Sequence, residues 1–378
     1  MAKNKKRKSI PKEIVLKLWA LTAGRCEFTG CNKPLWRDGL TWQEANFSHI
    51  AHIIAASPDG PRGDKLNSRK LAKDFSNLML VCLDHHKLID SKEQVKEYPV
   101  ERLRLFKEQH EKRITIQTAA QDSMVTTILI FKANIGSRTV NIPFEHARQA
   151  IAPKFPSDNQ GIVFDYTNLD AKGDSSYWLH LKSQIKDEVK LNIRKNQGIC
   201  CLSVFAIGPI PLLAYLGLCI GNIIPCELYQ KHRDTQRWAW KSTRGSKSFK
   251  FNIKKFNRKS RNRKVALILS LSGKIHRIEV EKVLGDDKPS YEISINHPSP
   301  LFLTSKNRLL QFQKAYRKLI TEIRSQHGPK CEIHLFPAVP APIAVMCGKE
   351  LLPKVDPPLF VYDHIDNAQG FKFALKIN

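Results

Sequence analysis

Cysteines and histidines near the N-terminus constrain this chain more than any other feature. Cys26 and Cys31 form a C-x4-C pair, and further along Cys82 and His85 form a C-x2-H pair. Three thiols and one imidazole are the soft donors that tetrahedral zinc prefers. With all four ligands supplied by the protein, the site would be structural and would hold together a region with little core of its own. The alternative is a chance grouping of thiols beside a catalytic histidine.

The charge of the chain indicates its partner. Lys and Arg number 62 against 35 Asp and Glu, a formal net charge of +27, so we expect a polyanion. Nucleic acid is the first candidate, because each neutralised phosphate releases counterions whatever the base sequence. Hydrophobic residues make up 42% and charged residues 26%, which excludes a disordered or collagen-like chain. Prolines and glycines interrupt the long uncharged run 199–226, so we expect no membrane span.

A small, polar stretch separates two regions of different character. We expect one domain over residues 1–117, a linker at 118–123 and a second domain over 124–378. Helical spacing of apolar residues over 100–114 closes the first domain. No apolar segment follows the basic residues 3–8, so no signal peptide is expected. The other six of the nine cysteines lie among apolar residues, so a cytoplasmic location without disulfides follows.

The second region alternates strand-like and helical patterns. Strands are expected at 124–132, 199–207, 265–271 and 331–336, and helices at 144–152, 212–220, 306–325 and just before Gly348. The order strand, tight turn and proline-started helix occurs twice, so we expect two related α/β units side by side. Such folds bind ligands in crevices at the carboxyl ends of their strands.

A second histidine pattern overlaps the first. Ser48-His-Ile-Ala-His52 is typical of a strand, Asn77 precedes an apolar run ending at Cys82, and His86 comes shortly after it. This pattern resembles the HNH nuclease motif of the ββα-metal fold, with His52, Asn77 and His86 in its three positions. An imidazole can take a proton from water near neutral pH, as phosphodiester hydrolysis requires. The resemblance implies that His52 is the general base, that Asn77 orients it and its loop, and that His86 binds catalytic Mg²⁺ or another divalent cation.

The match to the HNH motif has one gap. Many HNH enzymes carry a metal ligand directly before the general base, where this chain has Ala51. His49 and Asp90 are the candidate replacements, and Asp90 lies one helical turn after His86 if that segment is a helix. Each has an equal alternative as a structural side chain. Arg62, in a Gly-Pro-Arg-Gly turn, is a candidate contact to a DNA phosphate.

The second region carries a further resemblance. Its segments Leu202-Ser-Val-Phe-Ala-Ile-Gly-Pro-Ile-Pro-Leu-Leu-Ala-Tyr-Leu-Gly217, Trp238-Ala-Trp240, His334-Leu-Phe-Pro-Ala-Val-Pro340 and 348–363 are similar to a SAVED domain. With the HNH half, the whole chain resembles the HNH-SAVED effector endonucleases of CBASS antiphage systems. The fold class implied is α/β, or α+β overall: a ββα-metal HNH domain with a zinc knuckle, then a SAVED domain of two CARF-like α/β units.

The resemblance implies a bacterial, cytoplasmic effector. A cyclic di- or trinucleotide binds the SAVED domain, a homo-oligomer (a dimer at rest) assembles further, and the HNH domains cut double-stranded DNA largely without sequence preference. Bases need aromatic faces and phosphates need donors, so the candidate ligand contacts are Trp238, Trp240, Ser270, Ser272, Lys306 and Arg308. The alternatives are core packing for the tryptophans and a solvated helix start for the basic pair.

Two other functions remain open. A restriction-type HNH nuclease would use its C-terminal domain to bind DNA, through the basic and aromatic segment 241–264. A non-enzymatic, zinc-containing protein would bind nucleic acid without cutting it. The segment 241–264 itself has two interpretations, a solvated hairpin with its phenylalanines packed inward or a nucleic-acid contact surface.

Overall fold

The structure is a computed structural model that describes residues 9–119, 122–169, 174–241, 249–257, 262–365 and 370–378. The chain forms two compact units, Met1–Gln121 and Asp122–Asn378. Each unit buries its own apolar side chains in its own core. The boundary between the units falls inside the segment 118–123 that the sequence suggested as a linker, of which residues 120 and 121 lie outside the described residues.

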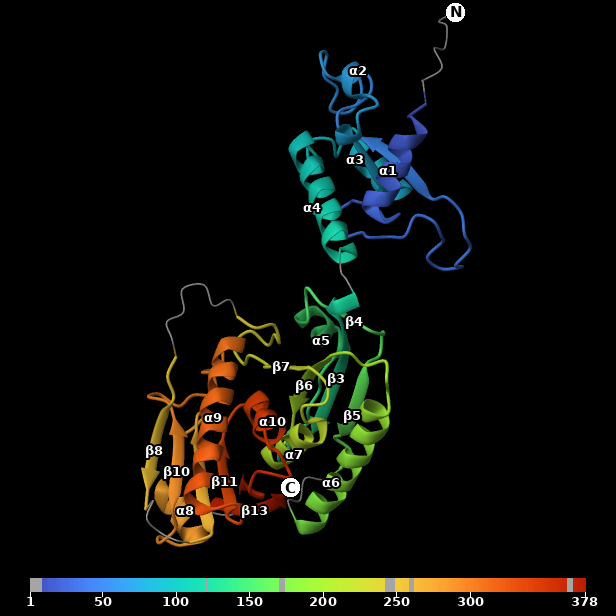
Figure 1. The fold of residues 1–378 in the computed structure, drawn as a ribbon. Coiled ribbons are helices and arrows are strands. Elements are labelled where there is room, and N and C mark those ends of the chain that lie inside the picture. Colours follow the sequence, from blue (N-terminus) through green and yellow to red (C-terminus); the bar gives the residue numbers. More distant parts are fainter. Residues whose placement is uncertain (1–8, 120–121, 170–173, 242–248, 258–261, 366–369) are drawn as a thin grey trace, which may run out of the picture. The chain divides into compact units, whose positions relative to one another are not determined.

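The first unit is a two-stranded sheet with helices packed against it (Figure 1). Its elements are α1 (Lys12–Thr22), β1 (Ser48–His52), α2 (Ser68–Leu71), η1 (Phe75–Asn77), β2 (Leu78–Cys82), α3 (Leu83–Asp90) and α4 (Val100–Thr118). Strands β1 and β2 are antiparallel, with Ser48 opposite Cys82 and His52 opposite Leu78. Strand β2 is apolar and buried throughout, and the chain passes directly from it into α3. The strands expected at His52 and after Asn77 are therefore confirmed.

The core of the first unit is small, and a loop contributes part of it. Leu103 and Phe106 of α4 pack against β2, and Cys26 and Leu35 from the loop between α1 and β1 are fully buried beside them. That loop has little regular structure of its own, since its strand-like pairings are two isolated bridges, Arg25 with Pro34 and Arg37 with Glu44. Side chains of the loop must therefore be held by something other than a strand ladder.

The second unit contains two sheets (Figure 1). Elements of its first half are η2 (Asp122–Met124), β3 (Val125–Ala133), α5 (Phe144–Ala150), β4 (Phe155–Pro156), β5 (Ile162–Tyr166), α6 (Ser175–Val189), η3 (Lys190–Arg194), β6 (Leu202–Ile207), α7 (Ile210–Ile220) and β7 (Cys226–Tyr229). The strands are parallel in the order β4-β3-β6-β7, with β5 also paired to β3.

The second half carries a six-stranded sheet in the order β13-β12-β11-β9-β10-β8. Its elements are β8 (Asn252–Phe256), β9 (Lys264–Ser270), α8 (Arg277–Leu284), β10 (Ser290–Ser294), α9 (Lys306–His327), β11 (Glu332–Ala338), α10 (Ala341–Lys349), β12 (Leu359–Ile365) and β13 (Gly370–Lys376). The four inner strands are parallel, and the edge strands β8 and β13 are antiparallel to their neighbours. The main expected strands and helices of both halves are confirmed with end shifts of a few residues.

Helices α7 and α10 cross between the two sheets at a pair of glycines (Figure 1). A Cβ atom on Gly217 would lie 1.9 Å from the carbonyl oxygen of Val345, and one on Gly348 would lie 1.7 Å from that of Ala214. The two backbones are therefore in direct contact, which only glycine permits. Each helix follows a strand and a short turn and has a proline in its first turn, so the repeated strand, turn and helix is confirmed.

Two expectations about single segments meet different outcomes. The uncharged run 199–226 folds as β6, α7 and the start of β7, and within the described residues no helix combines the length and hydropathy of a membrane span. In the described part of the segment 241–264, strand β8 pairs with β10 rather than with β9, the next strand along the chain. Residues 242–248 and 258–261 of this segment lie outside the described residues.

Candidate functional site

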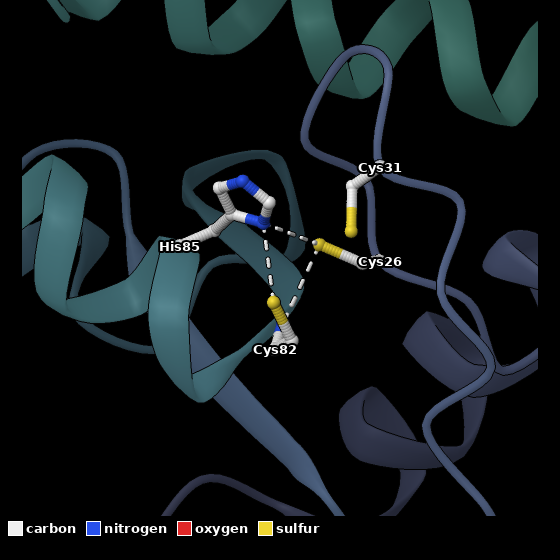
Figure 2. Close-up of side chains that lie close together, drawn as sticks. All are labelled: Cys26, Cys31, Cys82 and His85. Carbon is white, nitrogen blue, oxygen red and sulfur yellow. Dashed lines mark hydrogen bonds between the residues drawn. The ribbon is translucent and has the colours of Figure 1, made fainter. Parts of the chain in front are cut away.

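The four zinc-ligand candidates lie together in the first unit, as Figure 2 shows. Their ligand atoms all lie within 4.8 Å of one another. Nδ1 of His85 is 3.1 Å from Sγ of Cys82 and 3.7 Å from Sγ of Cys26. Cys26 and Cys31 come from the loop after α1, Cys82 ends β2, and His85 lies in the first turn of α3. Three sulfurs and one nitrogen converging in this way fit a tetrahedral zinc ion.

Neighbouring side chains fix this cluster in place. The ring of Phe28 stacks on His85 with centroids 3.9 Å apart, and the backbone N–H of Cys82 donates to Sγ of Cys26 over 3.4 Å. Burial raises the pKa of the Cys26 thiol well above its ordinary value. A buried thiolate is therefore costly by itself, and a bound cation supplies the opposite charge that it needs.

Glu27 ties the loop to the sheet. Its carboxylate accepts a hydrogen bond from the N–H of Leu80 over 2.5 Å and lies 3.8 Å from Nζ of Lys107. Burial raises the pKa of Glu27 to about 7. Sequence reasoning missed this residue, because a single glutamate between a cysteine and a phenylalanine carries no spacing signal.

Two histidines of the expected HNH pattern, His52 and His86, lie near each other together with the candidate replacement ligand His49. The rings of His49 and His86 are 5.5 Å apart between centroids. Burial lowers the pKa of His86, the positive charges that His49 and His52 would carry lower it further, and Asp90 opposes them. His86 is therefore held as a neutral imidazole, the form that binds a metal ion.

His52 is oriented by a backbone carbonyl. Its Nε2 lies 3.0 Å from the carbonyl oxygen of Ala72, and because a carbonyl can only accept, Nε2 carries the proton and donates it. In the neutral ring, Nδ1 is then the nitrogen that can accept a proton from water. No side-chain pattern could reveal this contact, because its acceptor is a backbone atom in the loop after α2.

Asn77 acts as a clamp on the chain that follows β1. Its Nδ2 donates to the carbonyl oxygens of Ile54 and Leu71 over 2.8 and 3.2 Å, and its Oδ1 accepts from the N–H of Ile54 over 2.8 Å. The side chain is buried, so three satisfied hydrogen bonds repay its desolvation. Asn77 thus holds together the two segments on which His52 depends.

Arg62 has partners inside the protein in place of the phosphate that the sequence suggested. Its side chain is only 4% exposed, and it donates to Asp90 over 2.7 Å and to the carbonyl oxygens of Ile53 over 2.8 Å and Ile89 over 2.5 Å. These contacts join the end of β1 to the end of α3. Asp90, a candidate metal ligand, is therefore the ion-pair partner of Arg62 and lies near His86 without being free.

The structure corrects two of the six candidate ligand contacts in the second unit. Trp238 is 3% exposed and packs edge-on against Phe205, so its ring belongs to the core and offers no face to a base. Ser270 is also buried, and its hydroxyl accepts from the N–H of Ile275 over 3.3 Å. The spacing of the tryptophans alone could not distinguish core packing from base stacking, because buried strands and base-binding surfaces both carry aromatic residues.

The other four candidates lie closer to the surface. Trp240 is half-buried near the ring of His232, and Ser272 is half-buried with its backbone N–H on the carbonyl of Ala338. Lys306 is 51% exposed and donates to Glu227 over 2.7 Å. Arg308 lies 4.7 Å above the ring of Phe249.

Glu227, which sequence reasoning missed, joins the two halves of the second unit. Glu227 lies on β7, the edge strand of the first sheet. Its carboxylate binds Nζ of Lys154 of the same half over 3.1 Å and Nζ of Lys306 of α9 over 2.7 Å. These hydrogen bonds lower the pKa of Glu227 despite its burial. The pairing is invisible in the sequence because all three residues are far apart along the chain.

The phenylalanines of the segment 241–264 pack inward where the structure describes them. Phe249 and Phe251 contact the rings of Phe302 and Phe312, at centroid distances of 6.3 and 5.7 Å. Phe256 is half-buried under Arg277. The segment therefore offers no aromatic platform in its described part.

Comparison with known proteins identifies the second unit. Residues 181–377 match the SAVED family, described as the SMODS-associated and fused to various effectors sensor domain. The match spans more than half of the chain, and the chain belongs to this family. Residues 1–180 lie outside the match.

Solved structures add two similar chains. The Acinetobacter baumannii Cap4 SAVED/CARF-domain containing receptor with the cyclic trinucleotide 3'3'3'-cAAA is 12% identical, with a TM-score of 0.49 over 84% of this chain and 68% of that one. The corresponding receptor of Moraxella osloensis is 12% identical, with a TM-score of 0.41 over 78% and 65%. No curated protein sequence matches the chain.

Proposed function

We propose that this protein is an antiphage (CBASS) effector in which a cyclic oligonucleotide bound to the SAVED unit activates an HNH-type DNA endonuclease in the first unit. One observation carries the nuclease assignment: Nε2 of His52 is fixed by the carbonyl of Ala72, which leaves Nδ1 of the neutral ring as the proton acceptor, and His52 lies close enough to His86, the neighbour of His49, to act on its charge. Membership of a sensor-domain family supports the regulatory half. The basic charge of the chain supports DNA as the substrate.

Hydrolysis at this site would begin at Nδ1 of His52. That nitrogen takes a proton from a water molecule while the water oxygen forms a bond to phosphorus and the bond from phosphorus to the leaving sugar oxygen breaks. The leaving oxygen then takes up a proton, so the products are a phosphate end and a hydroxyl end. Asn77 contributes by holding the segments at Ile54 and Leu71 on which the orientation of His52 depends.

Two metal sites fit the residues that are present. His86, with His49 beside it, would hold a divalent cation such as Mg²⁺, which would stabilise the negative charge of the phosphate and the leaving oxygen. Asp90 supports His86 electrostatically from its ion pair with Arg62. Cys26, Cys31, Cys82 and His85 would hold a structural zinc ion with no position left for substrate.

Regulation requires a difference in affinity. A cyclic nucleotide activates only if it binds the assembling state of the homo-oligomer better than the resting dimer, since equal affinity shifts no population. Trp240, Ser272, Lys306 and Arg308 remain the candidate contacts. The inward packing of Phe249 and Phe251 argues against the alternative in which this unit stacks on DNA bases.

The test is plasmid cleavage by the full chain with Mg²⁺, with and without a panel of cyclic di- and trinucleotides that includes 3'3'3'-cAAA. We expect nicking and linearisation with one cyclic nucleotide only. The variant His52→Ala should lower the rate by about 10²-fold or more, the usual contribution of a general base. The control His180→Ala removes an exposed histidine of α6 and should cut normally.

Each outcome separates the two halves of the proposal. Equal cleavage without any ligand would overturn the sensing half and leave the nuclease standing. DNA binding without cleavage would overturn the nuclease half and favour a zinc-containing nucleic-acid binder. Full activity in His52→Ala would overturn the assignment of His52 as the general base.

A further inference from the structure

The loop between the zinc ligands and β1 ends in a small hairpin, residues 36–47, which we name the tryptophan hairpin. The N–H of Asp38 donates to the carbonyl oxygen of Gln43 over 2.9 Å, and the N–H of Ala45 donates to that of Trp36 over 3.2 Å. The chain then enters β1, which carries His49 and His52. The hairpin is thus joined directly to the strand of the proposed nuclease site.

This hairpin exposes large apolar side chains to solvent. The exposed fractions are 40% for Trp36, 88% for Leu40, 64% for Trp42 and 37% for Phe47. Single exposed apolar residues are common, but four within twelve residues form a patch of the kind that binds a partner.

The hairpin is held in a defined shape before any partner binds. Oδ1 of Asp38 accepts from the N–H of Leu40 over 3.0 Å and from the N–H and hydroxyl of Thr41 over 2.7 and 3.0 Å. Trp42 has φ = 61°, a left-handed conformation that is unusual for a bulky residue. Strain of this kind persists where the surrounding structure imposes it, and here it directs a tryptophan to the surface.

One guanidinium lies over both tryptophan rings of the hairpin. The guanidinium of Arg37 lies 3.8 Å from the ring of Trp42 and 4.7 Å from that of Trp36. At the base of the hairpin, Arg25 and Arg113 both bind Asn32, over 3.1 and 2.8 Å. Lys33 is exposed beside them. The acids of the hairpin are Asp38, which already binds backbone N–H groups, and Glu44.

We propose that the tryptophan hairpin is a DNA-contacting wedge. Leu40 and Trp42 would insert against base steps in a groove, and Arg37 with the cations at its base would bind the flanking phosphates. A second copy of this chain is a less favoured partner. Its Arg25, Lys33 and Arg37 would face the same three cations of the first copy, and like charges repel. The inference rests on the proposed function in taking duplex DNA as the substrate, and it assigns the wedge a role in binding rather than in hydrolysis.

The test measures DNA binding by the full chain with His52→Ala as the background, in which cleavage is slowed by about 10²-fold or more. A fluorescein-labelled duplex reports affinity by anisotropy, and a 2-aminopurine base in a second duplex reports unstacking. We expect Leu40→Ala with Trp42→Ala to weaken binding about tenfold, within the range of about five- to 150-fold that one stacked base contributes. The same pair should abolish the rise in 2-aminopurine fluorescence.

A matched control removes two other exposed apolar side chains of the same unit. Leu66 and Leu105 are 86% and 48% exposed, and Leu66→Ala with Leu105→Ala should bind DNA as the background does. Arg37→Ala should lower the slope of log affinity against log salt by about one. Should the double hairpin variant fail to fold, Leu40→Ala alone serves, because this side chain is almost wholly in solvent.

Unchanged affinity and unchanged 2-aminopurine fluorescence in the hairpin variants would overturn the wedge. A loss of self-association without a loss of DNA binding, seen by light scattering, would assign the hairpin to a second copy and also overturn it. Failure of the proposed function is distinguishable: a chain with His52 intact would not cut DNA, while the hairpin variants would still lose binding.

Discussion

His110 is held in its neutral form between two helices of the first unit. It lies on α4, it is 6% exposed, and its Nε2 lies 3.2 Å from the carbonyl oxygen of Thr22 in α1, to which it donates. Its Nδ1 accepts from the guanidinium of Arg113 over 3.0 Å. Both ring nitrogens are thus satisfied only while the imidazole is uncharged, and burial lowers its pKa.

This arrangement predicts an acid-sensitive first unit. The folded-state pKa of His110 lies below the 6.5 of a free histidine, so the unfolded chain takes up a proton first as pH falls. The stability that neutral His110 contributes is present above about pH 6.5 and is lost as pH falls through the folded-state pKa. His110→Gln should flatten the dependence of the melting temperature of this unit between about pH 7.5 and pH 5. Calorimetry that finds equal pH slopes in both proteins would contradict this.

For single residues, the sequence indicated which side chains belong to the candidate sites better than it indicated what each side chain contacts. A motif singled out His52 and Asn77, and spacing singled out the four candidate zinc ligands, which the structure brings together. The acceptor of His52, the carbonyl of Ala72, and the internal partners of Arg62 could not be predicted, since they depend on how a loop folds back.

At the scale of elements, the crossing of α7 and α10 leaves no room for one methyl group. We expect Gly348→Ala to destabilise the second unit by about 2–3 kcal/mol or more, because the new Cβ would meet the backbone of Ala214 and one helix must move. Urea unfolding measures the change. The control Gly273→Ala adds a methyl where nothing lies within 4 Å and should be nearly neutral. Equal stability of both variants would show that the helices separate without cost.

Elements with a strong local pattern were predictable and those defined by distant pairing were not. Strand β6 and helix α7 follow from an apolar run punctuated by Pro and Gly, and α9 follows from its helical period. The edge strand β8 pairs with β10, which comes two strands later, whereas its local sequence left a hairpin as one of two interpretations. Pairing across a sheet is set by burial of both partners rather than by either sequence alone.

At the scale of the whole molecule, the two units have separate cores, so they should unfold as separate transitions. The first core includes the candidate zinc ligand Cys26, so removing a bound zinc ion should abolish the calorimetric transition of the first unit. The second unit, whose cores contain no member of that cluster, should melt unchanged. A zinc chelator and Cys31→Ser should act alike.

The matched control for the cysteine change is Cys200→Ser, an exposed thiol of the second unit. It should leave both transitions and the zinc content, measured by elemental analysis, as they are in the wild type. Two unchanged transitions in the presence of the chelator would contradict a structural zinc.

The glycine crossing also limits how the two halves of the second unit can rearrange. Gly217 and Gly348 lie toward the carboxyl ends of α7 and α10, and the backbones touch there and cannot come closer. Any rotation of one half against the other that keeps this contact must turn about it. The amino-terminal ends of the two helices lie furthest from the contact and therefore move the most. These ends adjoin the turns after β6 and β11, where strand and helix meet.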